Sequence, residues 1–430
     1  MYIFSWTYIK EKWTHVGFQK YFRNMGWSFS GKVFSLLMSL FVGVLVARYL
    51  GPERYGVLNY AISFVTIFFF LASFGIDNIL VRDLIKYREK NESILNTAFV
   101  IKIVGGILTI LIATTASILV KNDFYTTILV FIYSLQLLFI PIIVTDAYFQ
   151  SILKYKYSFA AQFISTLSVS ILKLYLVYVG LGTGWFVLAL VFEITVSTFV
   201  QINIFTKIGR QIKFDFNYNL AKKMISDGWP FILNTAFILI YTKIDQVLVG
   251  KMIGTTSLGI YSAGVKLAEM WYFIPATICG VLFPAIINAK IIHNDLYRAR
   301  LKKIFLLIIL LSFFIALFEF IFAKQLIYIL FGQVYMGSVV ILKIYTWAGI
   351  IVAIITIMQQ YLIIENKTKI IMYSSLVGAA TNVILNLLFI PPFGIIGSAW
   401  ATVISYTIIP IFIFISTNIN LLKTKCEKNV

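Results

Sequence analysis

The chain has 430 residues, of which 60% are hydrophobic and 12% are charged, and its mean hydropathy is +0.92. A soluble globular protein cannot bury so much apolar surface, so the composition indicates an integral membrane protein. The formal net charge of +19 would elsewhere suggest a nucleic-acid-binding protein, but here the position of each charge relative to the apolar segments decides its meaning.

Residues 1–26 mix aromatic and basic side chains, which predicts a cytoplasmic segment lying on the membrane surface. Twelve apolar segments follow, and each is long enough to cross a bilayer, which takes about 20 residues. The sequence therefore predicts an all-α integral membrane protein. The predicted spans are 27–50, 57–81, 94–120, 124–150, 157–180, 184–206, 227–250, 257–289, 301–323, 337–363, 370–390 and 394–417.

The chain repeats a short glycine motif near its midpoint. Gly51 and Gly56 reappear 203 residues later as Gly254 and Gly259, each time between two apolar segments, and we expect a hinge role for them. Transporters are often built from two related halves. We therefore predict two pseudo-symmetric six-helix lobes around a central cavity, at 27–206 and 227–417. A cytoplasmic loop at 207–226 would join them, and a cytoplasmic tail would occupy 418–430.

Basic residues lie unequally on the two sides of the predicted spans. Segments on the side of the N-terminus carry 25 of the 36 lysines and arginines, and the opposite segments carry 5. Short cytoplasmic loops are enriched in these residues, so both termini are predicted in the cytoplasm. This distribution explains most of the positive charge without a nucleic-acid partner.

Ionisable residues also occur within the predicted spans. A charge near the middle of a spanning helix costs on the order of 2.5–3.5 kcal/mol, so these side chains should face protein or water. Some would pair between helices, and the others should line an aqueous cavity. The ionisable residues within the predicted spans are Lys32, Lys102, Lys173, Lys243, Lys266, Lys343, Asp77, Asp146, Glu193, Asp245, Glu269 and Glu319.

Helical spacing places several polar residues on common faces, which supports a cavity. Lys243 and Asp245 should point to nearly opposite sides of their helix, so only one of them can easily face the centre. Lysines favour an anionic substrate such as a phosphate, and hydroxyl and amide groups suit a sugar. The aligned sets are Asn59, Ser63, Thr66, Ser73 and Asp77; Gln162, Thr166 and Lys173; Glu193, Ser197 and Gln201; and Ser262, Lys266 and Glu269, the last two as candidates for an ion pair.

The sequence offers no convincing enzyme, metal or cofactor motif. Residues 26–32 have the spacing of a phosphate-binding loop, but Val33 stands where serine or threonine would bind magnesium. The cysteines and histidines, two of each, predict neither a disulfide framework nor a metal site. Transport would then depend on an ion gradient or on the gradient of the substrate. Buried Asp77, Glu193 and Asp245 are the candidates for binding a coupling proton or sodium ion.

Four segments resemble a known family. GKVFSLLMSLFVGVLVARYLGPERYGVLNYAISF and FGIDNILVRDLIK resemble the first two helices of oligosaccharide flippases of the Wzx type, in a superfamily that includes multidrug exporters. TKIDQVLVGKMIGTTSLGIYSAGVKLAE and PPFGIIGSAWATVISY resemble later helix pairs of that family. The resemblance implies a multi-pass protein of the bacterial inner membrane. It would move an undecaprenyl-diphosphate-linked oligosaccharide to the periplasmic leaflet for O-antigen or capsule assembly, by alternating access and ion antiport.

The resemblance also implies cavity cations that hold the diphosphate and, as partners, polysaccharide polymerases and glycosyltransferases. Lys32 is the first candidate and Lys243 the opposing charge, with Lys102, Lys173, Asn59 and Gln162 as further substrate-binding residues. All of these cations are lysines, so the sugars would contribute more to recognition than in a site with arginine. A multidrug exporter remains an alternative, although cationic drugs would favour an acidic cavity. A membrane polysaccharide polymerase would usually have a long periplasmic loop, which this pattern lacks.

Overall fold

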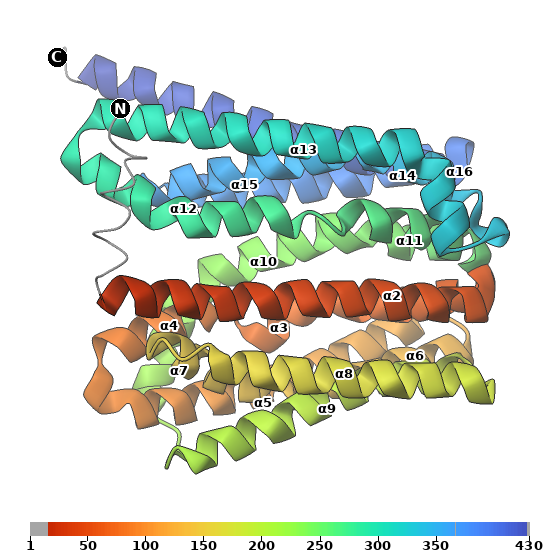
Figure 1. Cartoon of the computed structure of the whole chain (residues 1–430), viewed down its shortest axis with the longest axis horizontal. Helices are drawn as coiled ribbons and strands as arrows, with labels where there is room; N and C mark the ends of the chain where they lie inside the picture. Colours follow the sequence, from red (N-terminus) through yellow and green to blue (C-terminus); the bar gives the residue numbers. More distant parts are fainter. Residues whose placement is uncertain (1–15, 366, 428–430) are drawn as a thin grey trace.

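The computed structural model describes residues 16–365 and 367–427. Within these residues all regular secondary structure is helical, and nine helical segments are long and apolar enough to cross a membrane. The long helices lie roughly side by side along one axis of the molecule (Figure 1). The predicted all-α membrane architecture is confirmed, whereas the count of twelve spans and their orientation stay predictions. Residues 1–15 of the predicted surface segment and 428–430 of the predicted tail lie outside the described residues.

The first half of the chain forms the helices drawn from red to yellow-green in Figure 1. They are α2 (Val16–Ile67), α3 (Phe69–Ser73), α4 (Asp77–Lys86), η1 (Arg88–Lys90), α5 (Asn91–Leu119), α6 (Phe124–Ser134), η2 (Leu135–Leu138), η3 (Ile140–Ile143), α7 (Val144–Ser151), α8 (Lys156–Val179) and α9 (Thr183–Lys207). Here η denotes a short 3₁₀ helix.

The second half forms the helices drawn from green to blue, and it contacts the first half chiefly where α2 packs against α10 and α11. Its elements are α10 (Tyr218–Met252), α11 (Thr255–Glu269), α12 (Phe273–Ile292), α13 (Asn294–Leu330), η4 (Gln333–Tyr335), α14 (Ser338–Tyr345), α15 (Ala348–Ile364) and α16 (Thr368–Glu427).

Two of these elements are pairs of helices joined at a kink. In α2 the kink is at Gly51, with φ of 67°, and in α16 it is at Gly394, with φ of 60°. Both angles lie in the left-handed region that glycine adopts without a Cβ clash. Pro52 directly follows Gly51, and Pro392 lies shortly before Gly394. Because proline has no backbone N–H group, each one removes a helix hydrogen bond near the kink.

Four predicted spans are interrupted in the structure. The segment predicted at 57–81 ends its helix before Asp77, because Phe74 and Gly75 have positive φ angles. Asp77 therefore begins a new helix and does not continue the polar face of Asn59. The segment at 124–150 contains two 3₁₀ turns around Pro141. The segment at 257–289 is broken between α11 and α12, and the one at 337–363 is broken between α14 and α15. Hydropathy alone does not register such local breaks.

The glycine repeat forms a contact between the two halves. A Cβ on Gly56 would lie 1.8 Å from the carbonyl oxygen of Thr255, and a Cβ on Gly259 would lie 1.9 Å from that of Pro52. Pro52 and Thr255 are themselves 203 residues apart, so the contact follows the repeat. Only glycine permits the two backbones to approach so closely. We call this end of the bundle the Gly51 end.

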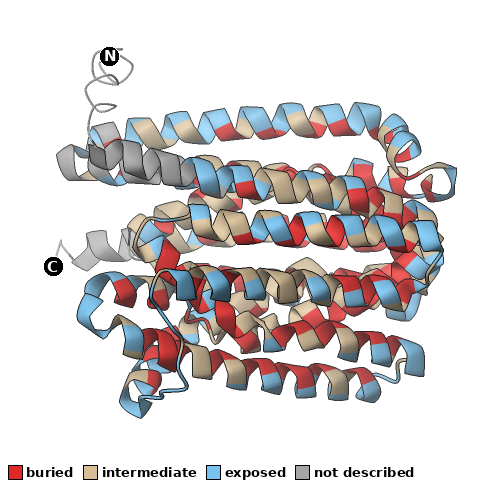
Figure 2. Ribbon diagram, turned by 60° about the horizontal axis from the view of Figure 1, so that its bottom comes forward, coloured by how far each residue is buried: buried red, intermediate tan, exposed pale blue. Residues whose placement is uncertain are grey.

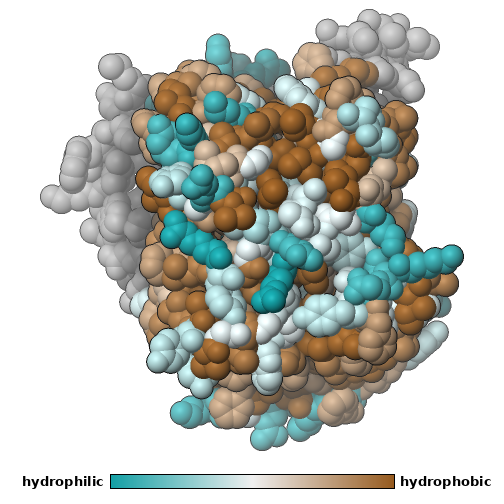
Figure 3. Space-filling model, turned by 90° about the vertical axis from the view of Figure 1, so that its right-hand side faces the viewer, coloured by the Kyte–Doolittle hydropathy of each residue, from teal (hydrophilic) through white to brown (hydrophobic). Residues whose placement is uncertain are grey.

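Further contacts close the Gly51 end. Tyr335 donates a hydrogen bond of 2.7 Å to the carbonyl of Ala47, and Arg48 donates one to the carbonyl of Ile329. Figure 3 views the right-hand end of Figure 1, and hydrophilic side chains gather there in a band across an otherwise largely apolar surface. The halves are thus joined by backbone packing and by hydrogen bonds to carbonyl groups.

The outer surface of the bundle is apolar. Buried residues follow the inward faces of the helices and exposed residues follow the outward faces (Figure 2). The exposed residues include large hydrophobic side chains such as Phe199, Phe314 and Leu388. Exposed apolar surface of this extent indicates contact with lipid.

Candidate functional site

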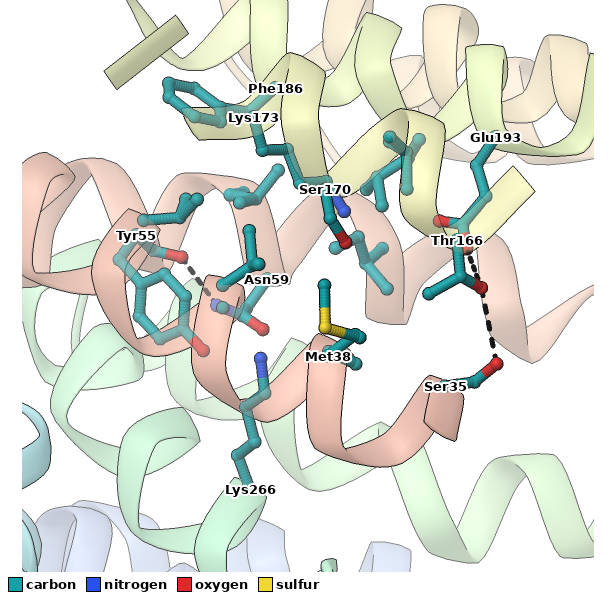
Figure 4. A pocket seen from close by; sticks show the side chains of 18 residues that line it. Ser35, Met38, Tyr55, Asn59, Thr166, Ser170, Lys173, Phe186, Glu193 and Lys266 are labelled. Carbon is teal, nitrogen blue, oxygen red and sulfur yellow. Dashed lines mark hydrogen bonds between the residues drawn. The ribbon is translucent and has the colours of Figure 1, made fainter. Parts of the chain in front are cut away.

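A cavity with several polar side chains in its wall lies where α2, α8 and α9 of the first half meet α11 of the second half. Its volume is about 200 Å³. Figure 4 shows that the cavity receives side chains from both halves of the molecule. The polar residues that line it are Ser35, Ser39, Asn59, Thr166, Ser170, Lys173, Glu193 and Lys266.

Two further spaces share lining residues with this cavity. One of about 320 Å³ shares Ser39, Asn59 and Lys266 and reaches Lys243 and Glu269. The other, of about 510 Å³, shares Ser35 and reaches Lys32, and aromatic residues such as Trp27 and Phe159 contribute to its wall. Because the spaces share walls, we treat them as one branched cavity that is widest toward Lys32. We call that end the Lys32 end.

Lys173 and Lys266 enter the cavity from opposite walls (Figure 4). Lys173 is on α8 and Lys266 on α11, so one ammonium comes from each half of the chain. The Lys266 ammonium rests against the α2 backbone, since a Cβ on Gly43 would lie 2.2 Å from its Nζ. Among the described residues neither lysine has a carboxylate within ion-pairing distance. Both ammonium groups are therefore available to an anion.

Neutral hydrogen-bonding groups and one carboxylate also line this cavity. Thr166 donates to Glu193 Oε1 at 3.4 Å, and Thr166 and Ser35 are linked at 3.3 Å between their hydroxyl oxygens. Gln162 donates to the Thr166 hydroxyl at 3.4 Å. These long, weak bonds can exchange for bonds to the hydroxyl groups of a bound sugar.

Lys243 is paired within the cavity wall. Its Nζ lies 3.7 Å from Glu269 Oε2, and Glu269 also accepts a bond of 3.4 Å from the Tyr345 hydroxyl. The helical spacing predicts a possible ion pair between Lys266 and Glu269. The structure instead pairs Glu269 with Lys243 and leaves Lys266 facing the cavity, because α10 packs beside α11 and brings Lys243 within reach.

Other predicted site residues take different places. Lys32 and Gln162 are exposed at the Lys32 end, and Asn59 lines the centre, where its amide donates to the Tyr55 carbonyl at 2.8 Å. Lys102 is 1% exposed and pairs at 2.6 Å with Asp77, which is 51% exposed. Neither member of this pair lines the branched cavity. Their geometry is that of a structural ion pair between α4 and α5.

Asp245 lies buried within the second half of the chain. The Tyr261 hydroxyl donates to Asp245 Oδ2 at 2.6 Å, Thr402 donates to the same oxygen at 3.5 Å, and the Gln246 amide donates to Oδ1 at 2.7 Å. Among the described residues no cation pairs with it. A network of buried amides and hydroxyls continues from this carboxylate through Asn382, Asn386, Ser398 and Ser405.

The sequence identifies Lys266 as an intramembrane charge but does not distinguish it as a substrate-binding residue. The available signal was Gly43, whose missing side chain leaves room for the ammonium. That signal has no meaning until α2 and α11 are known to be neighbours.

Comparisons with known proteins extend these observations. The family model described as polysaccharide biosynthesis protein matches residues 21–290. An uncharacterized membrane protein from Methanocaldococcus jannaschii is 23% identical over an alignment of 429 residues. The match covers 92% of this chain and 83% of that protein.

Solved structures of membrane transporters share the fold. An inward-facing multidrug resistance MATE family transporter of the MOP superfamily aligns with a TM-score of 0.72 at 14% identity, covering 91% of this chain and 96% of the transporter. The lipid II flippase MurJ, in an inward closed conformation, aligns with a TM-score of 0.70 at 18% identity, covering 91% and 87%. A MOP superfamily transporter from Pyrococcus furiosus, described as having a binding pocket of reverse polarity, aligns with a TM-score of 0.61 at 14% identity, covering 94% and 95%.

Proposed function

This chain belongs to the polysaccharide biosynthesis protein family, and from that premise we propose that it is a flippase for lipid-linked oligosaccharides. Its substrate would be an undecaprenyl-diphosphate-linked repeat unit, moved from the cytoplasmic to the periplasmic leaflet for O-antigen or capsule synthesis. The observation that carries this proposal is the pair of cavity lysines, Lys173 and Lys266, which face each other from the two halves without carboxylate partners.

The proposed topology has twelve spans with both termini in the cytoplasm of a bacterial inner membrane. Two of the nine candidate spans are the kinked helix pairs around Gly51 and Gly394, and counting each pair as two spans gives eleven. The helices α11 and α12 together supply the twelfth span. The asymmetry of basic residues supports the orientation. In this orientation the Lys32 end faces the cytoplasm and the Gly51 end faces the periplasm.

We assign the diphosphate to the space between Lys173 and Lys266. An ammonium group provides three donors and a compact positive charge, and both suit a phosphate oxygen. Lys32 and Gln162 at the wide end would receive the head group first, and Asn59 would contact it at the centre. Lys243 is held by Glu269, so its contribution to the substrate would be indirect.

We propose alternating access on the basis of the same geometry. The cavity is widest at the Lys32 end, while the glycine contacts close the Gly51 end. An anion bound between Lys173 and Lys266 would offset the repulsion between two cations on different halves, which draws the halves together around it. Separation of the Gly56 and Gly259 contacts would then open the other end.

Ion coupling is assigned to Asp245, with Glu193 as the second candidate. Asp245 has three protein donors and no cation, so a proton or a sodium ion would neutralise it. Asp77 is less suitable, because Lys102 already neutralises it. Polysaccharide polymerases and glycosyltransferases remain proposed partners at the two membrane surfaces.

Reconstitution tests this function directly. Purified protein in liposomes with a tagged undecaprenyl-diphosphate oligosaccharide should move the glycan between leaflets, measured by its accessibility to a glycosidase on one side. The double substitution Lys173→Ala and Lys266→Ala should abolish movement. The matched control is Lys324→Ala, an exposed lysine outside the cavity, which should transport normally. Equal rates in all three proteins, or rates equal to protein-free liposomes, would refute the assignment.

A further inference from the structure

The most hydrophobic of the nine candidate spans carries a buried carboxylate that the proposed transport cycle does not use. This span is Tyr297–Leu330 of α13, and Glu319 is the acidic residue within its apolar part. The flanking Phe318 and Phe320 side chains are exposed, whereas Glu319 is only 7% exposed. Glu319 thus turns away from lipid and into the protein.

The Glu319 carboxylate is held by two neutral donors. Trp271 Nε1 donates to Oε2 at 3.2 Å, and the Thr346 hydroxyl donates to the same oxygen at 2.6 Å. Among the described residues no cation lies within ion-pairing distance. Lys343 on α14 is near, but its ammonium stands over the Phe320 ring, 5.3 Å from the ring centroid.

Both donors lie at interruptions between helices. Trp271 lies between the end of α11 at Glu269 and the start of α12 at Phe273. Thr346 lies between the end of α14 at Tyr345 and the start of α15 at Ala348. The two interruptions also contact each other directly, because a Cβ on Gly349 would lie 2.1 Å from the Trp271 ring. One carboxylate therefore ties together two places where the helix hydrogen bonds are incomplete.

The same segment connects to the transport cavity. Tyr345, the neighbour of Thr346, donates its hydroxyl to Glu269, and its carbonyl accepts a bond of 3.3 Å from Tyr272. Glu269 in turn pairs with Lys243 in the cavity wall. A change in the position of the α14–α15 interruption would thus alter the charge arrangement of the cavity.

The remaining titratable or charged groups on elements packed against α13 do not satisfy Glu319. Among the described residues none of them forms a hydrogen bond or ion pair with it. They are Lys343 and Tyr345 on α14, Tyr272 beside α12, Cys279 and Lys290 on α12, Tyr361 on α15 and Tyr335 on η4.

We propose that Glu319 is a proton-binding site whose charge state sets the geometry of these two helix interruptions. A buried carboxylate with no cation is costly, and binding one proton converts it to a neutral carboxylic acid. Release of that proton makes the bonds from Trp271 and Thr346 charge-assisted and therefore shorter and stronger. The deprotonated form pulls the two interruptions together, and the protonated form lets them separate. The site is independent of which substrate the cavity carries.

Infrared difference spectroscopy tests the site without any substrate. Spectra of the purified protein at a series of pH values should contain a carboxylic acid C=O stretching band that appears as the pH falls. Glu319→Gln, which keeps the shape but cannot bind the proton, should remove the Glu319 component of that band. Glu365→Gln, a control at a carboxylate paired with Lys290, should retain it.

Thr346→Val is the second variant, because it removes one hydrogen bond to Glu319 and keeps the size of the side chain. It should move the band to higher frequency, as expected for a less strongly hydrogen-bonded C=O group, and it decides the question if Glu319→Gln does not fold. A wild-type protein without a pH-dependent carboxylic acid band would overturn the proposal. So would a band unaffected by both substitutions. Neither result bears on flipping, which is measured separately in liposomes.

Discussion

Gly56 and Gly259 face each other across the two halves of the chain, and a Cβ on Gly56 would lie 3.0 Å from the amide nitrogen of Gly259. The two residues occupy equivalent positions in the sequence repeat. The first glycines of the repeat have a different role, since Gly51 and Gly254 adopt φ angles of 67° and 109°. One pair thus permits the chain to turn, and the other permits the two turns to pack together.

The contact predicts that Gly56→Val keeps the Gly51 end from closing. Overpacking costs about 1–3 kcal/mol, which shifts a two-state equilibrium by roughly 5- to 150-fold. A cysteine in place of Ser170, in a variant without Cys279 and Cys426, should then react faster with an impermeant thiol reagent added on the periplasmic side. Gly280→Val is the control, because a Cβ there meets nothing within 4 Å. Equal labelling of both variants would show that the glycine contact is not the closure.

The placement of Lys266 predicts a specific effect of Gly43→Ala. The new Cβ would occupy the space next to the ammonium, so Lys266 must move away from the α2 wall. A hydrogen bond to a charged group contributes about 1.5–3 kcal/mol, so Lys266→Ala should weaken binding of a diphosphate-linked lipid roughly 10- to 150-fold. Gly43→Ala should weaken it less. Binding of the tagged lipid to purified protein measures both effects, and unchanged affinity in Lys266→Ala would remove this lysine from the site.

The ion pair of Lys102 and Asp77 predicts an asymmetry in stability. Lys102 is buried and Asp77 is half-exposed, so Asp77→Ala leaves a buried ammonium without a partner. Breaking a buried pair in this way costs about 3–5 kcal/mol, whereas Lys102→Met leaves only a carboxylate that water can solvate. Thermal unfolding in detergent should therefore show the larger loss for Asp77→Ala. Equal losses would mean that water reaches Lys102.

The buried position of Asp245 predicts that Asp245→Asn separates binding from ion coupling. Asparagine retains the size and shape of the side chain, and its oxygen can still accept the bond from the Gln246 amide while its NH2 group donates to a hydroxyl. It cannot carry the negative charge that attracts a cation. The affinity for the lipid should stay within about twofold, because Asp245 does not line the cavity. A twofold change in affinity is well below the roughly 1.4 kcal/mol that corresponds to a tenfold change. Transport in liposomes should lose its response to an imposed proton or sodium gradient. A variant that still responds to both gradients would transfer the coupling role to Glu193.

The sequence predicts the helical membrane architecture because hydropathy and helix length depend on local composition alone. It also identifies Gly51, Gly56, Gly254 and Gly259, since a repeat can be found by comparing the chain with itself. It does not predict the helix end before Asp77, where one non-glycine residue, Phe74, adopts a left-handed conformation. Such a conformation is imposed by the packing of neighbouring segments.

The cavity was only partly predictable for a related reason. Helical spacing gives the face on which Lys173 or Lys102 lies, but not which neighbour that face meets. In the structure Lys173 meets the gap between the halves, and Lys102 meets Asp77. The pairing of Lys243 with Glu269 likewise depends on how α10 lies beside α11, which no spacing within one helix determines.

The proposed activity of the protein is the movement of a lipid-linked glycan across the membrane. The most direct cellular measurement compares lipid-linked glycans and surface polysaccharide in a strain lacking this gene with the same strain carrying the wild-type or the Lys173→Ala, Lys266→Ala form. We expect complete lipid-linked units to accumulate on the cytoplasmic leaflet and surface chains to be lost, with only the wild-type gene restoring them. Single units at the surface would instead indicate a polymerase, and unchanged glycans with altered drug tolerance would contradict the flippase account in favour of an exporter.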